Sequence, residues 1–164
     1  MAKLINALEI IETALLNDTV DTSYFKDSYI EVCQEEYIRP VLTQDLYDAI
    51  VSQSALDTLT SVNSTLLEDY IKPALAFYVA LDIVPHLSIK TTNQGLMVGS
   101  SETSNPATSQ ERSDIQTRYR EQGNTMLEKM VRYIEHEDNL ASYPLYENGS
   151  SSVITATLKG GIIL

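Results

Sequence analysis

The chain has 164 residues, 23 acidic and 11 basic side chains for a formal net charge of −12, and one cysteine. A chain of this length suits one domain with one core, because folding at this size buries about 70% of the surface that the unfolded chain exposes. The negative charge argues against a protein that grips nucleic acid phosphates, and the lone Cys33 excludes an intrachain disulfide.

The first predicted helix covers residues 21–39, where apolar side chains recur at steps of three and four. Asp21 or Thr22 can cap its start. After a turn, Thr43 offers a cap for a short second helix that carries Leu46 and Ile50. The Ser, Thr and Asn-rich residues 52–64 are predicted to be a connection.

One phrase of eight residues occurs twice, as EEYIRPVL at 35–42 and EDYIKPAL at 68–75, with five identities. Each copy places a proline inside an otherwise helical pattern. Proline lacks the N–H that a helix needs and costs about 3 kcal/mol in a helix interior. We therefore interpret Pro40 and Pro73 as structural helix breakers, with Pro40 ending a helix and Pro73 kinking one or opening its last long segment.

Two further helices are predicted. Residues 65–86 form one that is apolar almost all round between 74 and 84, which indicates the buried central helix. Thr108 and Glu111 have the spacing of a capping box and begin a long helix that ends near Asn139. Gly123 lies on the apolar stripe of this last helix, where it is expected to let another helix approach closely.

Between these helices, residues 88–106 are rich in Thr, Asn, Gln, Gly and Ser. Residues 87–91 and 96–100 are predicted to pair as a small hairpin around Asn93-Gln94-Gly95. A segment this long without helix is typical of a binding loop or of disorder. As a binding loop, it would contact a partner through its apolar residues Leu96, Met97 and Val98.

The C-terminal residues 147–164 are β-prone and apolar. A lone hydrophobic strand needs a partner edge, so we predict protein contacts through Val153, Ile154, Leu158, Ile162, Ile163 and Leu164. The predicted fold class is therefore mainly α, a small bundle of about four helices with a long polar loop or hairpin and an extended C-terminal β-like arm. Residues 1–146 form the helical domain and residues 147–164 the arm.

The residue pattern offers little chemistry, and we predict no catalytic, cofactor-binding or metal-binding residues. Neither histidine comes with a credible nucleophile, and Cys33 lies on an apolar helix stripe. The alternative is an all-α, metal-dependent enzyme of nucleotide metabolism, because carboxylate pairs on neighbouring helices can hold Mg²⁺. Its candidate residues are Glu35, Glu36, Glu68 and Asp69. A two-unit helical repeat built on the duplicated phrase is a further interpretation, although repeat arrays usually need three units.

No secretion signal is expected, since charge interrupts the N-terminal segment early. The longest apolar stretch, residues 74–81, is far shorter than the ~20 residues of a membrane-spanning helix. We therefore expect a soluble intracellular protein.

Several landmarks follow one another along most of the chain. They are Leu4-Ile5-Asn6 with Glu9-Ile10, Val20-Asp21, Gln34 with Tyr37-Ile38 and Pro40-Val41-Leu42, Leu46-Tyr47, Val84-Pro85 with Leu87, Gly95, Asn139, and Tyr143-Pro144-Leu145-Tyr146. In this order and spacing, residues 4–146 resemble the head-tail connector proteins of tailed bacteriophages, also called head completion or adaptor proteins, as found in phages of Bacteroidetes. The family commonly has Leu-Gly where this chain has Leu42-Thr43.

The resemblance implies a structural protein of the virion and no enzyme. Connectors of this type dock as a ring, typically of twelve copies, beneath the portal of a filled capsid. The implied partners are further copies of the chain, the portal protein and downstream tail or neck proteins. Genomic DNA would pass without specific binding, because a channel lined by acids repels phosphates. The implied location is the neck at the portal vertex, after synthesis in the host cytoplasm.

Overall fold

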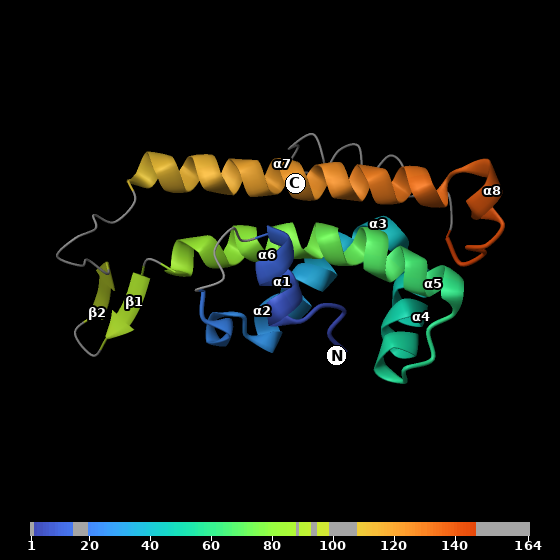
Figure 1. The fold of residues 1–164 in the computed structure, drawn as a ribbon, viewed down its shortest axis with the longest axis horizontal. Coiled ribbons are helices and arrows are strands. Elements are labelled where there is room, and N and C mark those ends of the chain that lie inside the picture. Colours follow the sequence, from blue (N-terminus) through green and yellow to red (C-terminus); the bar gives the residue numbers. More distant parts are fainter. Residues whose placement is uncertain (1, 15–19, 88, 93–94, 99–107, 147–164) are drawn as a thin grey trace.

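A long pair of helices organises the fold. The computed structural model describes residues 2–14, 20–87, 89–92, 95–98 and 108–146. Helix α7 (Ser109–Ile134) runs antiparallel to α6 (Lys72–Leu87), with a β-hairpin at one end of the pair and α8 (Glu137–Leu140) near the other (Figure 1). The structure is mainly α, as predicted.

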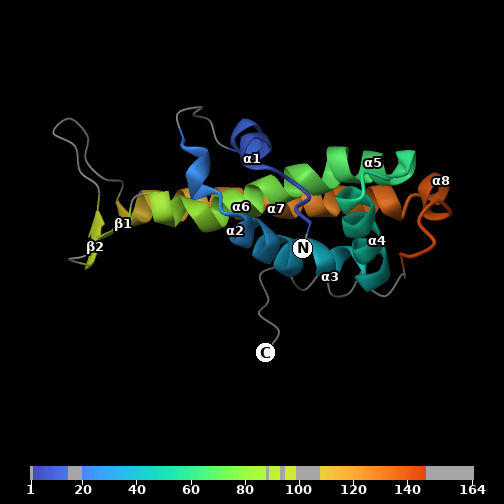
Figure 2. The ribbon, with the colours of Figure 1, turned by 90° about the horizontal axis from the view of Figure 1, so that it is seen from below.

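The remaining elements surround this pair. They are α1 (Ala7–Ala14), the 3-10 turn η1 (Thr22–Tyr24), α2 (Asp27–Cys33), the π-helical turn η2 (Gln34–Ile38), α3 (Arg39–Leu42), α4 (Gln44–Ala55), α5 (Ser61–Leu66), the π-helical turn η3 (Leu67–Ile71), β1 (Ile89–Thr92) and β2 (Gly95–Val98). Seen from below, α1 and α2 lie on opposite sides of the α6–α7 pair (Figure 2).

The core is built around α6, which packs against α1, α2 and α7. Its alanines and aliphatic side chains are buried on every side, from Ala74 through Leu75 and Val79 to Ile83. The predicted buried central helix is confirmed. The same helical segment begins earlier than predicted, at Ser61, where the Thr60 side chain accepts a hydrogen bond from the Asn63 N–H.

Both copies of the repeated phrase form the same structure, a π-helical turn followed by an α-helix whose second residue is proline. The Arg39 N–H donates to the Gln34 carbonyl and the Lys72 N–H to the Leu67 carbonyl, five residues back instead of four. Each copy is also closed by an ion pair, Glu35 with Arg39 and Glu68 with Lys72.

Pro40 therefore does not end the helix, which continues through it to Leu42. The π-helical turn widens the backbone one residue before the proline, so the ring avoids the clash with a carbonyl four residues back that a regular helix would impose. Pro73 opens the long segment α6, as expected. The expectation that the two prolines serve different purposes was wrong, because the local structure is the same.

Other boundaries differ in smaller ways. The first predicted helix begins as η1, capped by Asp21, and α2 starts only at Asp27. The predicted connection 52–64 shrinks to residues 56–60, since α4 extends to Ala55. The last helix ends at Ile134 and is followed by the separate α8, whose start is capped by His136. The capping box of Thr108 and Glu111 is confirmed.

The predicted hairpin is present. Strands β1 and β2 are antiparallel, with Ile89 opposite Val98 and Thr92 opposite Gly95. Leu87, predicted at the start of the first strand, belongs to α6 instead. In the part of the chain that the structure describes, no helix is long and apolar enough to cross a membrane.

Candidate interaction surfaces

The positive charge of the chain is concentrated on α7. This helix carries five of the 11 Lys and Arg residues against four of the 23 acids, so its net charge is +1 and the rest of the chain carries −13. Arg118, Lys129 and Arg132 are exposed on the side of α7 opposite the buried Gly123 and Met130. None of these three cations takes part in an ion pair among the described residues.

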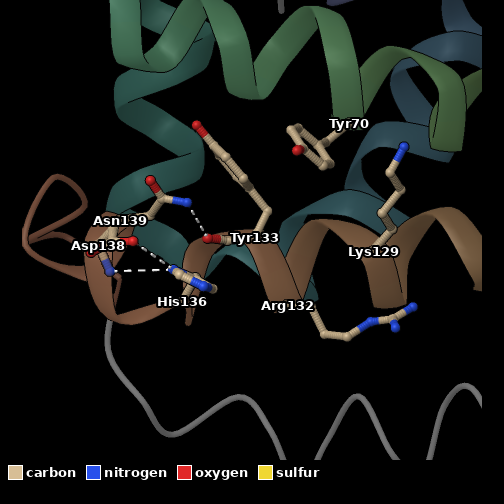
Figure 3. Close-up of a pocket in the computed structure, with 7 residues that line it drawn as sticks. All are labelled: Tyr70, Lys129, Arg132, Tyr133, His136, Asp138 and Asn139. Atoms are coloured by element: carbon tan, nitrogen blue, oxygen red, sulfur yellow. Dashed lines mark hydrogen bonds and ion pairs between the residues drawn. The ribbon is translucent and has the colours of Figure 1, made fainter.

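Two of these cations line an open hollow of about 660 Å³ where α7 meets α8, which we call the cationic pocket (Figure 3). Its lining residues are Tyr70, Lys129, Arg132, Tyr133, His136, Asp138 and Asn139. Lys129 and Arg132 are three residues apart on one helix, so both charges lie beside the same opening. The pocket also holds one acid, Asp138, which lies 3.5 Å from His136 Nδ1.

An aromatic stack forms the wall of the cationic pocket. The rings of Tyr70 and Tyr133 lie parallel, with centroids 4.3 Å apart, and the Lys129 ammonium sits 5.6 Å from the Tyr70 centroid. Tyr143 meets Tyr133 edge-on, and its hydroxyl donates to the Val62 carbonyl at 3.1 Å. These contacts tie α7, η3 and the chain after α8 together, so the wall is rigid.

Hydrogen bonds also fix the α8 side of the cationic pocket. The Asn139 side chain donates to the Tyr133 carbonyl at 2.9 Å, and His136 Nδ1 accepts from the Asp138 N–H at 3.3 Å. His136 is thus a helix cap, and the charge run that contains it is mainly a solvated helix end. Lys129 and Arg132 remain exposed and able to meet an anionic partner.

A second hollow, of about 490 Å³, lies on the outer side of α2 and η2. We call it the acidic face. Its lining residues are Ser28, Glu31, Val32, Glu35 and Glu36. They recur at the helical steps of three and four residues, so they share one side. Glu35 is held by Arg39 and by the Tyr47 hydroxyl at 3.1 Å, whereas Glu36 and Val32 are exposed, Val32 at 56%.

The carboxylates of the enzyme alternative have other occupations. Glu35 pairs with Arg39, and Glu68 pairs with Lys72, which also bridges to Glu9 on α1 at 2.7 Å. Within the described parts of the chain, no three His, Cys, Asp or Glu side chains gather to hold a metal ion.

Cys33 is completely buried, and its thiol donates to the Asp82 carboxylate at 3.3 Å. Burial, with the negative charge of Asp82 as the next cause, raises the pKa of this thiol well above its ordinary value. Since the thiolate is the reactive form, Cys33 is an inert core residue, as its place on the apolar stripe predicts. His86 stacks on Tyr29, with centroids 6.1 Å apart.

The predicted contact residues fall into two groups. Leu96, Met97 and Val98 all lie on β2, at the end of the molecule away from α8 (Figure 1). The arm and its residues Val153, Ile154, Leu158, Ile162, Ile163 and Leu164 lie outside the described residues. Contacts with a partner stay a prediction for both groups.

Sequence reasoning missed the cationic pocket. One signal was available, because Arg118, Lys129 and Arg132 recur at helical steps on the side of α7 opposite its apolar stripe. The tyrosine wall had no such signal, since Tyr70 and Tyr133 are brought together only by the packing of α7 on η3.

Comparison with known proteins gives one relationship. The model of a family described as a family of unknown function (DUF6712) matches residues 38–156. No curated protein and no solved structure matches the chain.

Proposed function

The chain belongs to a family of unknown function (DUF6712), and we propose that it serves as a bacteriophage head-tail connector, a virion protein that forms a ring beneath the portal. In this role it extends the DNA channel and joins the capsid to the tail. The observation that carries the proposal is the ordered set of landmarks from Leu4 to Tyr146 that resembles such connectors.

The distribution of charge supports this function. Outside α7 the chain carries −13, so a ring of copies can present a strongly negative surface to passing DNA and repel its phosphates. DNA then slides through the channel without specific binding. The same charge makes neighbouring copies repel one another, so the contacts between them require local attraction.

Two segments are suited to join the ring to its neighbours. The hairpin extends beyond the helical pair and carries Leu96, Met97 and Val98, which we assign to contact with the portal or an adjacent copy (Figure 1). The arm 147–164 adds a strand to a neighbouring subunit or to a downstream tail protein. The protein thus resides in the virion neck, with no enzymatic activity, cofactor or membrane contact.

Cryo-electron microscopy of the particle neck tests the function. We expect a closed ring of this helical domain, of about twelve copies as in the resembling connectors, directly below the portal. Virions that lack the chain, or that carry it away from the portal vertex, contradict the proposal.

A further inference from the structure

We propose that the cationic pocket of one copy receives the acidic face of a second copy, in a head-to-tail contact. This inference rests on the ring-forming function proposed above and names the surfaces that form its subunit contact. Neither surface was assigned by the sequence.

The first argument is complementarity of charge. Lys129 and Arg132 are exposed and form no ion pair among the described residues. Glu36 is likewise exposed on the acidic face, where no described cation pairs with it, whereas Glu35 beside it is already neutralised by Arg39. In a chain of net charge −12, self-association requires that the few free cations of one copy meet carboxylates of the next.

The second argument is position. Helix α6 packs against both α7 and α2 and lies between them, so the two surfaces point away from one another (Figure 1). They cannot meet within one copy. A contact between two different surfaces is heterologous, and repeated copies of it close into a ring when the rotation allows.

The third argument is that both surfaces pair charge with apolar area. Val32 is 56% exposed between the glutamates of the acidic face. In the cationic pocket, the half-buried rings of Tyr70 and Tyr133 stand beside Lys129 and Arg132. Stable protein contacts combine an apolar centre, often aromatic, with a charged rim, and Val32 against the tyrosine wall supplies that centre.

Charge reversal tests the contact on the full-length chain. Arg132→Glu and Glu36→Arg should each weaken self-association at least tenfold, measured by sedimentation velocity over a range of protein concentrations. The chain that carries both changes should recover it, because the reversed charges attract again. Circular dichroism and thermal melting of each variant check that the fold is retained.

Matched controls separate this effect from net charge. Arg120→Glu makes the same change on the same helix outside the cationic pocket, and Glu12→Arg makes it on the exposed side of α1. Both controls should associate like the unmodified chain. An unmodified chain that stays monomeric at the highest soluble concentration overturns the proposal, as does a double variant that does not recover association.

A crosslinking experiment distinguishes head-to-tail from symmetric pairing. Arg132→Cys and Glu36→Cys are made in separate chains and mixed with a short bismaleimide, and the unmodified chain serves as background because Cys33 is buried. Crosslinks between the two different variants are expected. Crosslinks only between identical variants, or none, overturn the contact.

The inference and the proposed function fail in different experiments. A ring in the virion neck that is joined through other surfaces refutes the contact but keeps the function. Charge-reversible association of a chain that is absent from virions keeps the contact but refutes the function.

Discussion

Gly123 of α7 lies directly against the ring of Tyr78 on α6. A Cβ at position 123 would stand 2.9 Å from Cε2 and Cζ of that ring. The ring cannot move aside, because it is buried, stacks on Tyr37 with centroids 4.0 Å apart, and donates its hydroxyl to Asn124 at 2.6 Å. This contact sets how closely the two long helices approach.

We therefore expect Gly123→Ala to destabilise the fold. Alanine gains about 1 kcal/mol over glycine in a helix, but overpacking a tight contact costs about 1–3 kcal/mol. The expected net loss is about 1–2 kcal/mol in the free energy of unfolding, measured by denaturant titration. Thr125→Ala, at an exposed position on the same helix, is the control and should change little. An alanine variant as stable as the unmodified chain would contradict the close packing.

Thr43 combines unfavourable backbone angles with a long-range hydrogen bond. Its φ is 68° and its ψ is 157°, a region that only glycine adopts easily, and its hydroxyl donates to the Leu145 carbonyl at 3.0 Å. Thr43→Gly relieves the strain, whereas Thr43→Ala keeps it, and both lose the bond. The glycine variant should be the more stable of the two by about 1–3 kcal/mol in thermal or denaturant unfolding.

The control for this comparison is Thr43→Ser, which keeps the hydroxyl and should lie close to the unmodified chain. The usual preference of exposed positions for alanine over glycine, if found at position 43, would refute the strained backbone.

The π-helical turn η3 should be needed because of Pro73. Deleting the exposed Asp69 removes one residue from this turn and leaves a regular helix, in which the proline ring meets a carbonyl and costs about 3 kcal/mol. The deletion combined with Pro73→Ala should recover most of that loss in denaturant titration. Pro73→Ala alone is the control, with a small expected effect. If the deletion is equally harmful with and without the proline, the two features are independent.

Buried tyrosines should make the fold unstable at alkaline pH. Burial raises the pKa of Tyr47 to about 12 and also raises the pKa values of Tyr78, Tyr143 and Tyr146. A tyrosine with a raised pKa keeps its proton longer in the folded state than in the unfolded state. Its stabilising effect is complete below the unfolded pKa of about 10 and is lost as the pH rises through the folded value.

We expect a cooperative alkaline transition above about pH 10, in which the ultraviolet absorbance of tyrosinate rises together with the loss of helical circular dichroism. Ionisation of most tyrosines before any loss of helix would show that these hydroxyl groups are accessible in the folded chain.

Truncation after Gly149 separates folding from assembly. The helical core closes with Tyr143 and Tyr146, both buried, so the shortened chain should melt like the full-length chain. The proposed role of the arm requires that neck assembly is lost, which complementation of a phage that lacks the gene measures by infectious particle yield. Normal yield from the shortened chain would refute the assigned role of the arm.

Short-range signals in the sequence determined much of the fold. The capping box of Thr108 and Glu111, the apolar run around Leu75 and the glycine at position 123 each depend on neighbours within a few residues or on helical periodicity. Because these interactions form within one segment, the elements and the buried central helix could be predicted from residue order alone. The hairpin followed from turn residues in the same way.

Tertiary structure decided the rest, because it depends on which segments pack together. The π-helical turns before Pro40 and Pro73 shift one hydrogen bond without changing the apolar pattern, so periodicity could not reveal them. Tyr70 and Tyr133 meet only after α7 docks on η3, and this docking creates the cationic pocket. Residue order shows how many charges the chain carries, but only packing determines which face carries them.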